Sequence, residues 1–330
     1  MFPLKVLILA PFSSEGLLRL RERFQVLYEP WTVTRRLWDP SELAPRLRHE
    51  AIEAVISEVD FFFDEVFAPG SPLRFLALCR QATNQADLEG ATAAGVVVVN
   101  TPGRNAQAVA ELAIGLLLAL ARRIPYAEAY VRAGQWRDPL DAYERFRGVE
   151  MAGKTLGVVG LGGIGRRVAR MGRALGARVI ATDPYARPMR GVPLVSLDDL
   201  LAQADFVSLH APDTPKTYHL ISAQRLTRMK PSAYLVNTGG GSLVDTDALC
   251  QALREGRLAG AALDVLEAAP LPPESPLLTC PNLLLTPHIG GATQETIARY
   301  SAMVADDLLR WIEGKRPRHL ANPAVWRGGR

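Results

Sequence analysis

Cysteine and histidine are scarce in this sequence, and their arrangement excludes several kinds of site. The chain of 330 residues holds three cysteines, Cys79, Cys250 and Cys280, which are too far apart to predict a zinc site or a disulfide framework. The five histidines and the carboxylates also lack the spacing of metal ligands, so we expect no metal. Unpaired cysteines are typical of a reducing compartment, and we predict a cytoplasmic protein.

Long apolar runs are lacking as well. The longest one, from Leu112 to Ala121, falls well below the ~18 residues of a membrane-spanning helix, so we expect no membrane partner. The stretch LKVLILAPF near the start ends its apolar run at Pro11 and has no small-residue cleavage site. We interpret it as a first buried strand and not as a secretion signal.

The sequence has no block of one charge. Its 38 basic and 34 acidic residues give a net charge of +4, and arginines are mixed with acids in stretches such as RLRERF. A nucleic-acid partner would require a basic stripe or a known motif, and neither is present. With 48% apolar and 22% charged residues, the composition is that of an ordinary globular protein.

Short β-branched runs alternate with helical patterns, which predicts parallel sheets with crossover helices in two domains. The first half contributes KVLILA, AVIS, RFLAL and VVVVN, and the second contributes TLGVVG, ARVIATD, DFVSLH, AYLVNT, GAALDV and NLLLTPH. Between the two sets a connector helix is predicted from just after Pro102 to Pro125. Its apolar face must be covered by the core, by a second subunit or by both.

The sequence TLGVVGLGGIGRRVARMGRALGARVIATD carries the strongest local signal. Gly160, Gly162 and Gly165 form the pattern G-x-G-x-x-G directly after a strand and before a helix, and Asp183 ends the next strand. In a dinucleotide site the first glycine allows a tight turn, the second lets the backbone approach the pyrophosphate, and the third lets helix and strand pack closely. The helix N-terminus favours phosphate, and Asp183 favours NAD over NADP because it would repel a 2′-phosphate.

Ligands bind outside the carboxyl ends of the strands in an open parallel sheet. The residues that end the later strands are therefore candidates: His210, Pro212, Asn237, Thr238, Gly239, Asp264 and His288. A lone histidine is more often structural, but His288 follows the run LLLTP at this edge, where it is suited to acid–base chemistry.

Several widely spaced motifs together resemble the NAD-dependent D-isomer-specific 2-hydroxyacid dehydrogenases, a family that includes phosphoglycerate, D-lactate and glyoxylate/hydroxypyruvate enzymes. These motifs are the glycine fingerprint, VVVVNTPGRNAQAVAEL, LVNT followed by LVD, AGAALDV and NLLLTPHIGGAT. The resemblance covers nearly the whole chain and is strongest from Val96 to Thr293.

The resemblance implies an α/β fold in which a Rossmann doubly wound parallel sheet, residues 101–294, is inserted into a flavodoxin-like substrate domain, residues 1–100 and 295–330. It also implies NAD, a small 2-oxo or 2-hydroxy acid substrate, hydride transfer at C2, and a homodimer formed through the nucleotide domain, including the connector helix. His288 matches the family's histidine that exchanges the proton on the substrate oxygen. Fingerprint, strand ends and resemblance together predict these cofactor-binding residues: Gly160, Gly162, Gly163, Ile164, Gly165, Asp183, His210, Pro212, Thr238, Gly239, Asp264, His288 and Gly290.

The chain departs from the family at two catalytic positions. The family's N-T-x-R-G-G reads NTGGGS from Asn237 onward, so Gly240 stands at the arginine position. Ala269 stands at the position of the glutamate in the family's ALDVFxxEP. The missing arginine would hold the substrate carboxylate, and loss of such a contact typically costs ~10²–10³ in rate.

Two residues are candidates to replace the missing groups. Glu267 lies two positions before Ala269, roughly 6 to 7 Å away in extended chain. Arg80 follows the run RFLAL and is either a contact for a substrate anion or a surface or structural arginine. Arg104 is expected in the turn that caps the connector helix. The segment LCRQATNQADLE lacks the glycines of the family's substrate loop, so the usual pose of the keto acid is not expected.

Two functions are open from the sequence. The first is NAD-dependent hydride transfer with His288 as acid and base, together with a divergent substrate or a low activity. The second is a catalytically silent NAD(H)-binding sensor or regulatory protein, which the absent side chains at Gly240 and Ala269 favour. Turnover of 2-oxo acids with NADH distinguishes them.

Overall fold

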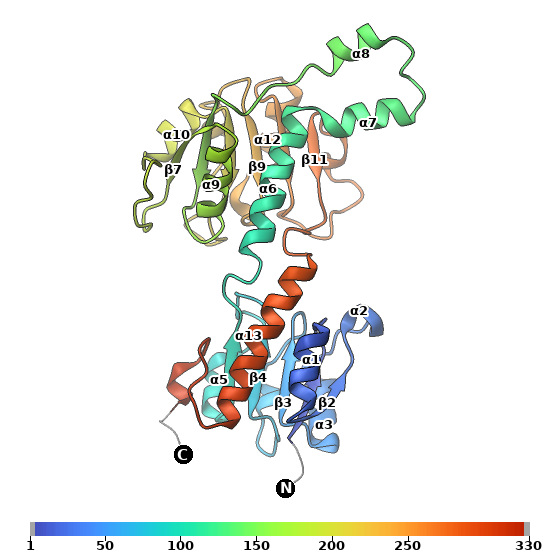
Figure 1. The fold of residues 1–330 in the computed structure, drawn as a ribbon, viewed down its shortest axis with the longest axis vertical. Helices are drawn as coiled ribbons and strands as arrows, with labels where there is room; N and C mark the ends of the chain where they lie inside the picture. The colour runs from blue at the N-terminus through green and yellow to red at the C-terminus, as the bar shows by residue number, and fades with distance from the viewer. Residues whose placement is uncertain (1–3, 327–330) are drawn as a thin grey trace. The chain divides into compact units, whose positions relative to one another are not determined.

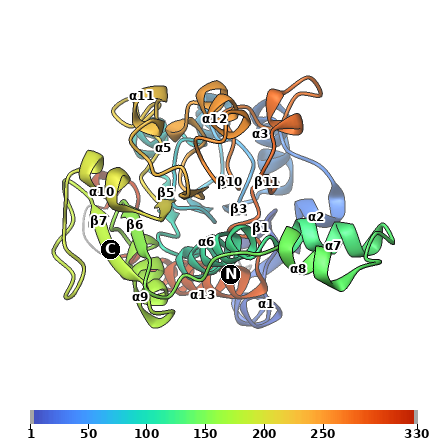
Figure 2. The same cartoon turned by 90° about the horizontal axis from the view of Figure 1, so that it is seen from above.

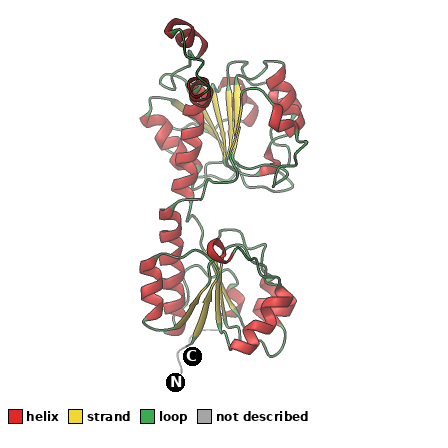
Figure 3. Cartoon of the chain, turned by 90° about the vertical axis from the view of Figure 1, so that its right-hand side faces the viewer, coloured by secondary structure: helices red, strands yellow, loops and turns green. Residues whose placement is uncertain are grey.

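The computed structural model describes residues 4–326, and the chain divides into two compact units (Figure 1). One unit combines residues 1–104 with residues 293–330, and the other holds residues 105–292. Each unit has its own parallel sheet with helices on both faces (Figure 3). The predicted α/β fold with two domains is confirmed.

The first unit is built on a five-stranded sheet in the order β2-β1-β3-β4-β5, which is the flavodoxin order. Its strands are β1 (Lys5–Ile8), β2 (Gln25–Tyr28), β3 (Ala54–Ser57), β4 (Phe75–Leu78) and β5 (Val97–Asn100). Its helices are α1 (Ser14–Arg21), α2 (Trp31–Thr34), α3 (Pro40–Glu50), α4 (Asp64–Phe67), α5 (Leu88–Ala93), α13 (Gln294–Ile312) and the short η3 (Pro323–Val325). Although α13 comes late in the chain, its Tyr300, Val304 and Leu308 are buried in one core with Val6 and Ile56 of the sheet.

The second unit carries a six-stranded sheet in the order β11-β10-β9-β8-β6-β7, in which every pair is parallel. Its strands are β6 (Thr155–Val159), β7 (Arg178–Thr182), β8 (Phe206–Leu209), β9 (Tyr234–Asn237), β10 (Gly260–Leu263) and β11 (Leu283–Leu285). Its helices are α6 (Ala106–Ala121), α7 (Ile124–Arg132), α8 (Pro139–Arg145), α9 (Gly165–Ala174), α10 (Leu197–Gln203), α11 (Ala223–Leu226), α12 (Thr246–Arg254), and the short η1 (Gly241–Leu243) and η2 (Pro276–Thr279). The order reverses direction between β6 and β8, and such a switch point is where ligands bind in open sheets.

The apolar connector helix α6 is covered largely by its own unit. Ala113, Leu117 and Ala121 are fully buried and share a core with Val158 and Val236 of the sheet. Beyond it, α7 and α8 extend away from the sheet (Figure 1 and Figure 2). Large exposed apolar side chains lie in this segment: Ile124, Val131, Trp136, Leu140 and Tyr143. The apolar side chains that this segment leaves exposed therefore lie on residues 124–145, beyond α6. Within residues 4–326 no helix is both long and apolar enough to cross a membrane.

The cysteines are not all unpaired. Cys250 of α12 and Cys280, which follows η2, form a disulfide with their Cα atoms 5.7 Å apart, and Cys79 is free and buried. The prediction that the cysteines form no disulfide was therefore wrong. The two residues are 30 positions apart in the chain, and the packing of η2 against α12 brings them together.

Candidate functional site

The glycine loop after β6 packs directly against the loop after β8. Gly160 has a φ of +89°, and a Cβ atom there would lie 2.8 Å from the backbone of His210 and Ala211. A Cβ atom on Gly165 would lie 1.9 Å from the carbonyl oxygen of Gly160, so α9 begins against the loop itself. No side chain fits at either position, and the two glycines hold the end of β6, the end of β8 and α9 in close contact.

The next part of the same loop is open. A Cβ atom at Gly162 would meet nothing within 4 Å, and one at Gly163 would meet only the end of Arg167 and Ala106 at 3.8 and 3.9 Å. Ile164 follows as the residue that caps α9, and the first N–H groups of a helix have no partner inside it. Open backbone in front of a helix N-terminus is what a pyrophosphate requires, so this loop fits a dinucleotide.

Asp183 ends β7 and is held against the glycine loop. Its Oδ2 accepts a hydrogen bond from the N–H of Leu161 at 2.7 Å, and its Oδ1 accepts one from the N–H of Tyr185 at 2.8 Å. Each carboxylate oxygen can accept a second hydrogen bond. The carboxylate is thus oriented by the protein and keeps capacity for the hydroxyls of a ribose, which fits NAD.

His210 connects the ends of β8 and β9 as a neutral imidazole. Its Nε2 lies 2.9 Å from Oγ of Ser208, and its Nδ1 lies 3.3 Å from Oγ1 of Thr238. Burial lowers the pKa of His210 to about 3, because the charged ring would lose its hydration. The ring therefore fixes Thr238 and carries no charge near neutral pH. Pro212 follows, and its carbonyl oxygen accepts a hydrogen bond from Oγ1 of Thr217 at 2.7 Å.

Asn237 holds the glycine run after β9 from inside. Its side chain is fully buried, its Nδ2 donates to the carbonyl oxygen of Gly240 at 2.8 Å, and its Oδ1 accepts from the N–H of Gly239 at 3.1 Å. A Cβ atom on Gly241 would lie 2.1 Å from the carbonyl oxygen of Leu266, in the loop after β10. The glycine run therefore lacks side chains, and it is also packed tightly against the loop after β10.

Asp264 fixes the loop that bears His288. Its buried carboxylate accepts three hydrogen bonds, from Thr286 Oγ1 at 2.7 Å, from the N–H of Ile289 at 2.8 Å and from the N–H of Gly290 at 2.8 Å. The N–H of His288 donates to the carbonyl oxygen of Asp264 at 2.9 Å. His288 has a φ of +54°, which is costly for a residue with a side chain, and its ring is exposed. Asp264 and Gly290, which the sequence places among the cofactor contacts, thus bond to each other and position His288.

Glu267, the first candidate to replace the missing acid, bonds to a different histidine. Its Oε1 lies 3.1 Å from Nε2 of His219 and 3.3 Å from the hydroxyl of Tyr218, and its Oε2 accepts from Thr246 at 3.4 Å. In residues 4–326 there is no hydrogen bond or ion pair between Glu267 and His288. Ala269 is exposed.

Arg80, the second candidate, follows β4 in the first unit. Its Nη1 lies 3.4 Å from Oε1 of Gln85, and among the described residues it forms no ion pair. Nearby in the chain, Arg104 pairs with Glu58 at 3.0 Å, with 12% and 18% of the two side chains exposed. Arg104 therefore pairs with the residue that follows β3. The sequence predicted its place in the turn before the connector helix but not this ion pair.

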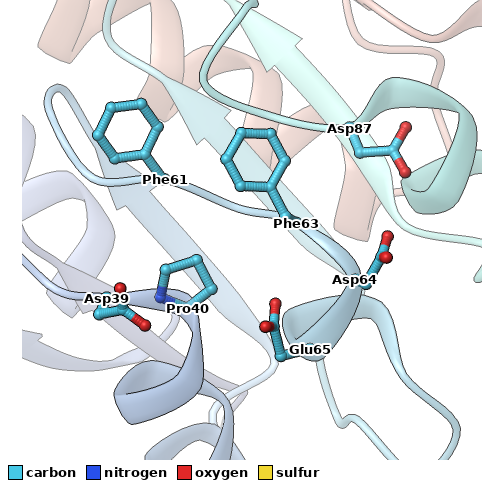
Figure 4. Close-up of a pocket in the computed structure, with 7 residues that line it drawn as sticks. All are labelled: Asp39, Pro40, Phe61, Phe63, Asp64, Glu65 and Asp87. Atoms are coloured by element: carbon cyan, nitrogen blue, oxygen red, sulfur yellow. The ribbon is translucent and has the colours of Figure 1, made fainter.

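A separate hollow in the first unit is acidic (Figure 4). The rings of Phe61 and Phe63 stack with their centroids 6.0 Å apart. The lining residues are Asp39, Pro40, Phe61, Phe63, Asp64, Glu65 and Asp87. Two of the carboxylates, Asp39 and Asp87, are already N-caps of α3 and α5. Neither Arg80 nor any other candidate named from the sequence lines this hollow.

The second unit therefore brings most of the sequence-predicted residues to one edge of its sheet, and the first unit holds Arg80 separately. Asn237, which supports the glycine run, was among the strand-end candidates, but two other contributors were missed: Asp213 and Ser242, which lie beside Gly240. Asn237 was visible as the last residue of a strand, whereas nothing in the sequence indicated that Asp213 approaches Gly240.

Comparisons with known proteins agree with this geometry. The family model described as D-isomer specific 2-hydroxyacid dehydrogenase, NAD binding domain, matches residues 114–290. A glyoxylate reductase of Korarchaeum cryptofilum is 38% identical over 330 residues, covering 97% of this chain and 96% of that protein. The crystal structure of the TT0316 protein from Thermus thermophilus superposes with a TM-score of 0.85 at 39% identity, covering 96% of this chain and 100% of that one. The NAD-complexed D-isomer specific 2-hydroxyacid dehydrogenase of Lactobacillus delbrueckii ssp. bulgaricus gives a TM-score of 0.79 at 27% identity, with 96% of this chain covered and 100% of that one.

Proposed function

Because this chain belongs to the D-isomer specific 2-hydroxyacid dehydrogenase family and is an NAD-dependent enzyme, we propose that it interconverts a small 2-oxo acid and its 2-hydroxy acid, with His288 exchanging the proton on the substrate oxygen. The observation that carries the proposal is the fixed, exposed His288 on the same sheet edge as an open glycine loop. NAD, when bound, supplies or accepts the hydride at the substrate's C2.

Each group at the edge has a distinct part in this proposal. The open backbone at Gly162 and Gly163 receives the pyrophosphate, and Asp183 receives the ribose. Asp264 holds the loop of His288 so that the ring faces outward. The three hydrogen bonds that Asp264 accepts make this loop rigid. A rigid support keeps a catalytic side chain within the narrow range of positions and orientations that the reaction requires. Arg80 is proposed to contact the substrate.

The experiment is NADH oxidation by the purified protein with glyoxylate, hydroxypyruvate and branched 2-oxo acids, with NADH binding followed separately by fluorescence. We expect turnover with at least one acid, and a loss of about 10²-fold or more in kcat on His288→Asn in a variant that still binds NADH. The change Arg80→Ala should raise KM for the acid and leave NADH affinity unaltered. Turnover that persists in His288→Asn would refute the assignment of the proton to this residue.

A second function is favoured by one observation. Gly240 and Ala269 supply no catalytic side chain, and Glu267 is bonded to His219 instead of to His288. A protein with this site could bind NAD(H) and act as a sensor or regulator without turnover. Tight NADH binding with no oxidation by any 2-oxo acid would select this function over the first.

We also propose that the protein is a homodimer whose contact includes residues 124–145. The face of α7 is hollowed between Ile124, Ala127 and Val131, with charged residues at its rim, and Leu140 and Tyr143 of α8 are 76% and 74% exposed. Apolar side chains exposed together in this way are typical of an interface. Light scattering should give twice the chain mass, and Leu140→Glu with Tyr143→Glu should give the mass of one chain.

A further inference from the structure

An aspartate occupies the space beside Gly240. A Cβ atom at position 240 would lie 2.7 Å from Cβ of Asp213 and 3.1 Å from its Cγ. Asp213 belongs to the loop after β8, and Gly240 belongs to the loop after β9, the neighbouring strand. A side chain at position 240 would thus project onto Asp213. Glycine at this position allows the loop with the aspartate to lie against the end of β9.

The carboxylate of Asp213 is fixed but not neutralised. Its Oδ1 accepts a hydrogen bond from Oγ of Ser242 at 2.5 Å, and its Oδ2 accepts one from the N–H of Ser242 at 3.3 Å. Among residues 4–326 it forms no ion pair, and each oxygen can still accept another hydrogen bond. An oriented acceptor with free capacity is suited to binding a donor.

Two further carboxylates contact the loop that carries Asp213. His219 of that loop donates its N–H to the carbonyl oxygen of Ser242 at 2.8 Å, and its ring lies 3.1 Å from Oε1 of Glu267 and 3.8 Å from Oδ2 of Asp245. Lys216, in the same loop as Asp213, has an exposed side chain. His210 is neutral because burial lowers its pKa. A second anionic group on a ligand would therefore be repelled here, whereas a hydroxyl or an ammonium group would be attracted.

We propose that Asp213 is a specificity residue that selects 2-oxo acids whose substituent on C2 carries a hydroxyl or ammonium donor, and that it disfavours a second carboxylate. The inference rests on the proposed function, because it concerns the substrate of that same site. The reduction itself is unaltered: the C2 carbonyl gains hydride from NADH and a proton on its oxygen, and NADH becomes NAD⁺.

Three 2-oxo acids that differ in one group provide the test. The substituent on C2 is an ethyl group in 2-oxobutyrate, the nearly isosteric hydroxymethyl group in hydroxypyruvate, and a carboxymethyl group in oxaloacetate. We expect kcat/KM for hydroxypyruvate to exceed that for 2-oxobutyrate by about tenfold, since a hydrogen bond to a charged acceptor in a partly exposed position is worth about this much. Oxaloacetate should be the poorest of the three.

Substitution of Asp213 then isolates its part. In Asp213→Ala the ratio between hydroxypyruvate and 2-oxobutyrate should fall about 5- to 10-fold, and Asp213→Asn should raise kcat/KM for oxaloacetate by a similar factor. Glu255→Gln removes an exposed carboxylate between α12 and β10, at the amino-terminal edge of the same sheet, and should leave all three ratios unchanged. Equal ratios in the wild type and in Asp213→Ala would overturn the inference.

A binding measurement separates this inference from the failure of the proposed function. Glycerate and 2-hydroxybutyrate, the corresponding hydroxy acids, can be titrated into the NADH complex and followed by NADH fluorescence without any turnover. Glycerate should bind about 5- to 10-fold more tightly than 2-hydroxybutyrate to the wild type and equally to Asp213→Ala. If both bind alike to the wild type, or if neither binds, the inference is wrong, whether or not the protein reduces a 2-oxo acid.

Discussion

The buried carboxylate of Asp264 holds the chain on both sides of His288. It accepts hydrogen bonds from Thr286 before the histidine and from Ile289 and Gly290 after it, while the N–H of His288 donates to the carbonyl oxygen of Asp264. The loop thereby keeps His288 in a left-handed backbone conformation, which costs about 1–3 kcal/mol elsewhere in proteins. A structure maintains such a conformation only when surrounding bonds impose it.

The change Asp264→Asn should therefore affect both stability and catalysis. An amide presents N–H groups to backbone donors, so at least one buried donor loses its acceptor, at a cost of about 1–3 kcal/mol in the free energy of unfolding. We expect kcat to fall about 10- to 100-fold because His288 is no longer fixed. Urea unfolding and NADH oxidation measure the two effects.

A matched control exists in the same sheet. Asp205 also accepts from a backbone N–H, that of Thr155 at 2.8 Å, but it lies before β8 at the opposite end of the strands. Asp205→Asn should destabilise the protein and leave kcat unchanged. Equal loss of kcat in both variants would show that Asp264 acts only through global stability.

Restoring an arginine at position 240 requires a second change. The single variant Gly240→Arg places a Cβ atom 2.7 Å from that of Asp213, and overpacking of this kind typically costs about 1–3 kcal/mol. We expect it to gain no activity with glyoxylate. Gly240→Arg with Asp213→Gly removes both the Cβ atom that the new side chain would meet and the negative charge, and should gain about 10²-fold in kcat/KM for glyoxylate. Steady-state kinetics and thermal unfolding measure the two effects, with Asp213→Gly alone as control. A gain in activity with glyoxylate in Gly240→Arg alone would show that the loop carrying Asp213 moves aside at little cost.

The sequence predicted those parts of the fold that depend on local pattern. All six strands of the second unit were named, because strands buried on both faces read as continuous apolar runs such as LGVV or FVSL. In the first unit β2, Gln25–Tyr28, was missed, since it is an edge strand with no fully buried residue. The NAD-type glycine loop was likewise readable, as its three glycines and Asp183 are fixed by their spacing.

Contacts between loops far apart in the chain were not predictable in this way. Asp213 follows Pro212 and reads as part of a turn, and only the pairing of β8 with β9 brings it to Gly240. Glu267 bonds to His219, which is 48 positions away in the chain. The short separation between Glu267 and Ala269 therefore could not predict which residue Glu267 contacts. The disulfide between Cys250 and Cys280 depends in the same way on how η2 packs.

His210 should make stability depend on pH. Its pKa is about 3 in the folded protein because of burial, and near its ordinary value of 6.5 in the unfolded chain. Between these values unfolding takes up a proton, so stability falls as pH falls below 6.5, by up to ~1.4 kcal/mol per pH unit, and above 6.5 this residue has no effect on the slope. Urea unfolding at pH 5 and pH 7.5 should show a smaller difference for His210→Gln than for the wild type. Equal differences would mean that His210 is accessible to protons in the folded state.

The disulfide between Cys250 and Cys280 should stabilise the second unit. It closes a loop of 30 residues that includes β10, Asp264 and Glu267, and a disulfide that constrains an unfolded chain in this way typically contributes about 2–4 kcal/mol. Reduction should therefore lower the melting temperature by several degrees. Thiol titration of the unreduced protein in denaturant should find only Cys79.

The double variant Cys250→Ala with Cys280→Ala provides the control, because its melting temperature should not respond to reductant. It should also release the segment that carries Glu267, which hydrogen exchange would detect as faster exchange between β10 and η2 than in the oxidised protein. Three titratable thiols in protein purified without reductant would contradict the pairing. A melting temperature that reductant lowers equally in the double variant would place the effect outside this disulfide.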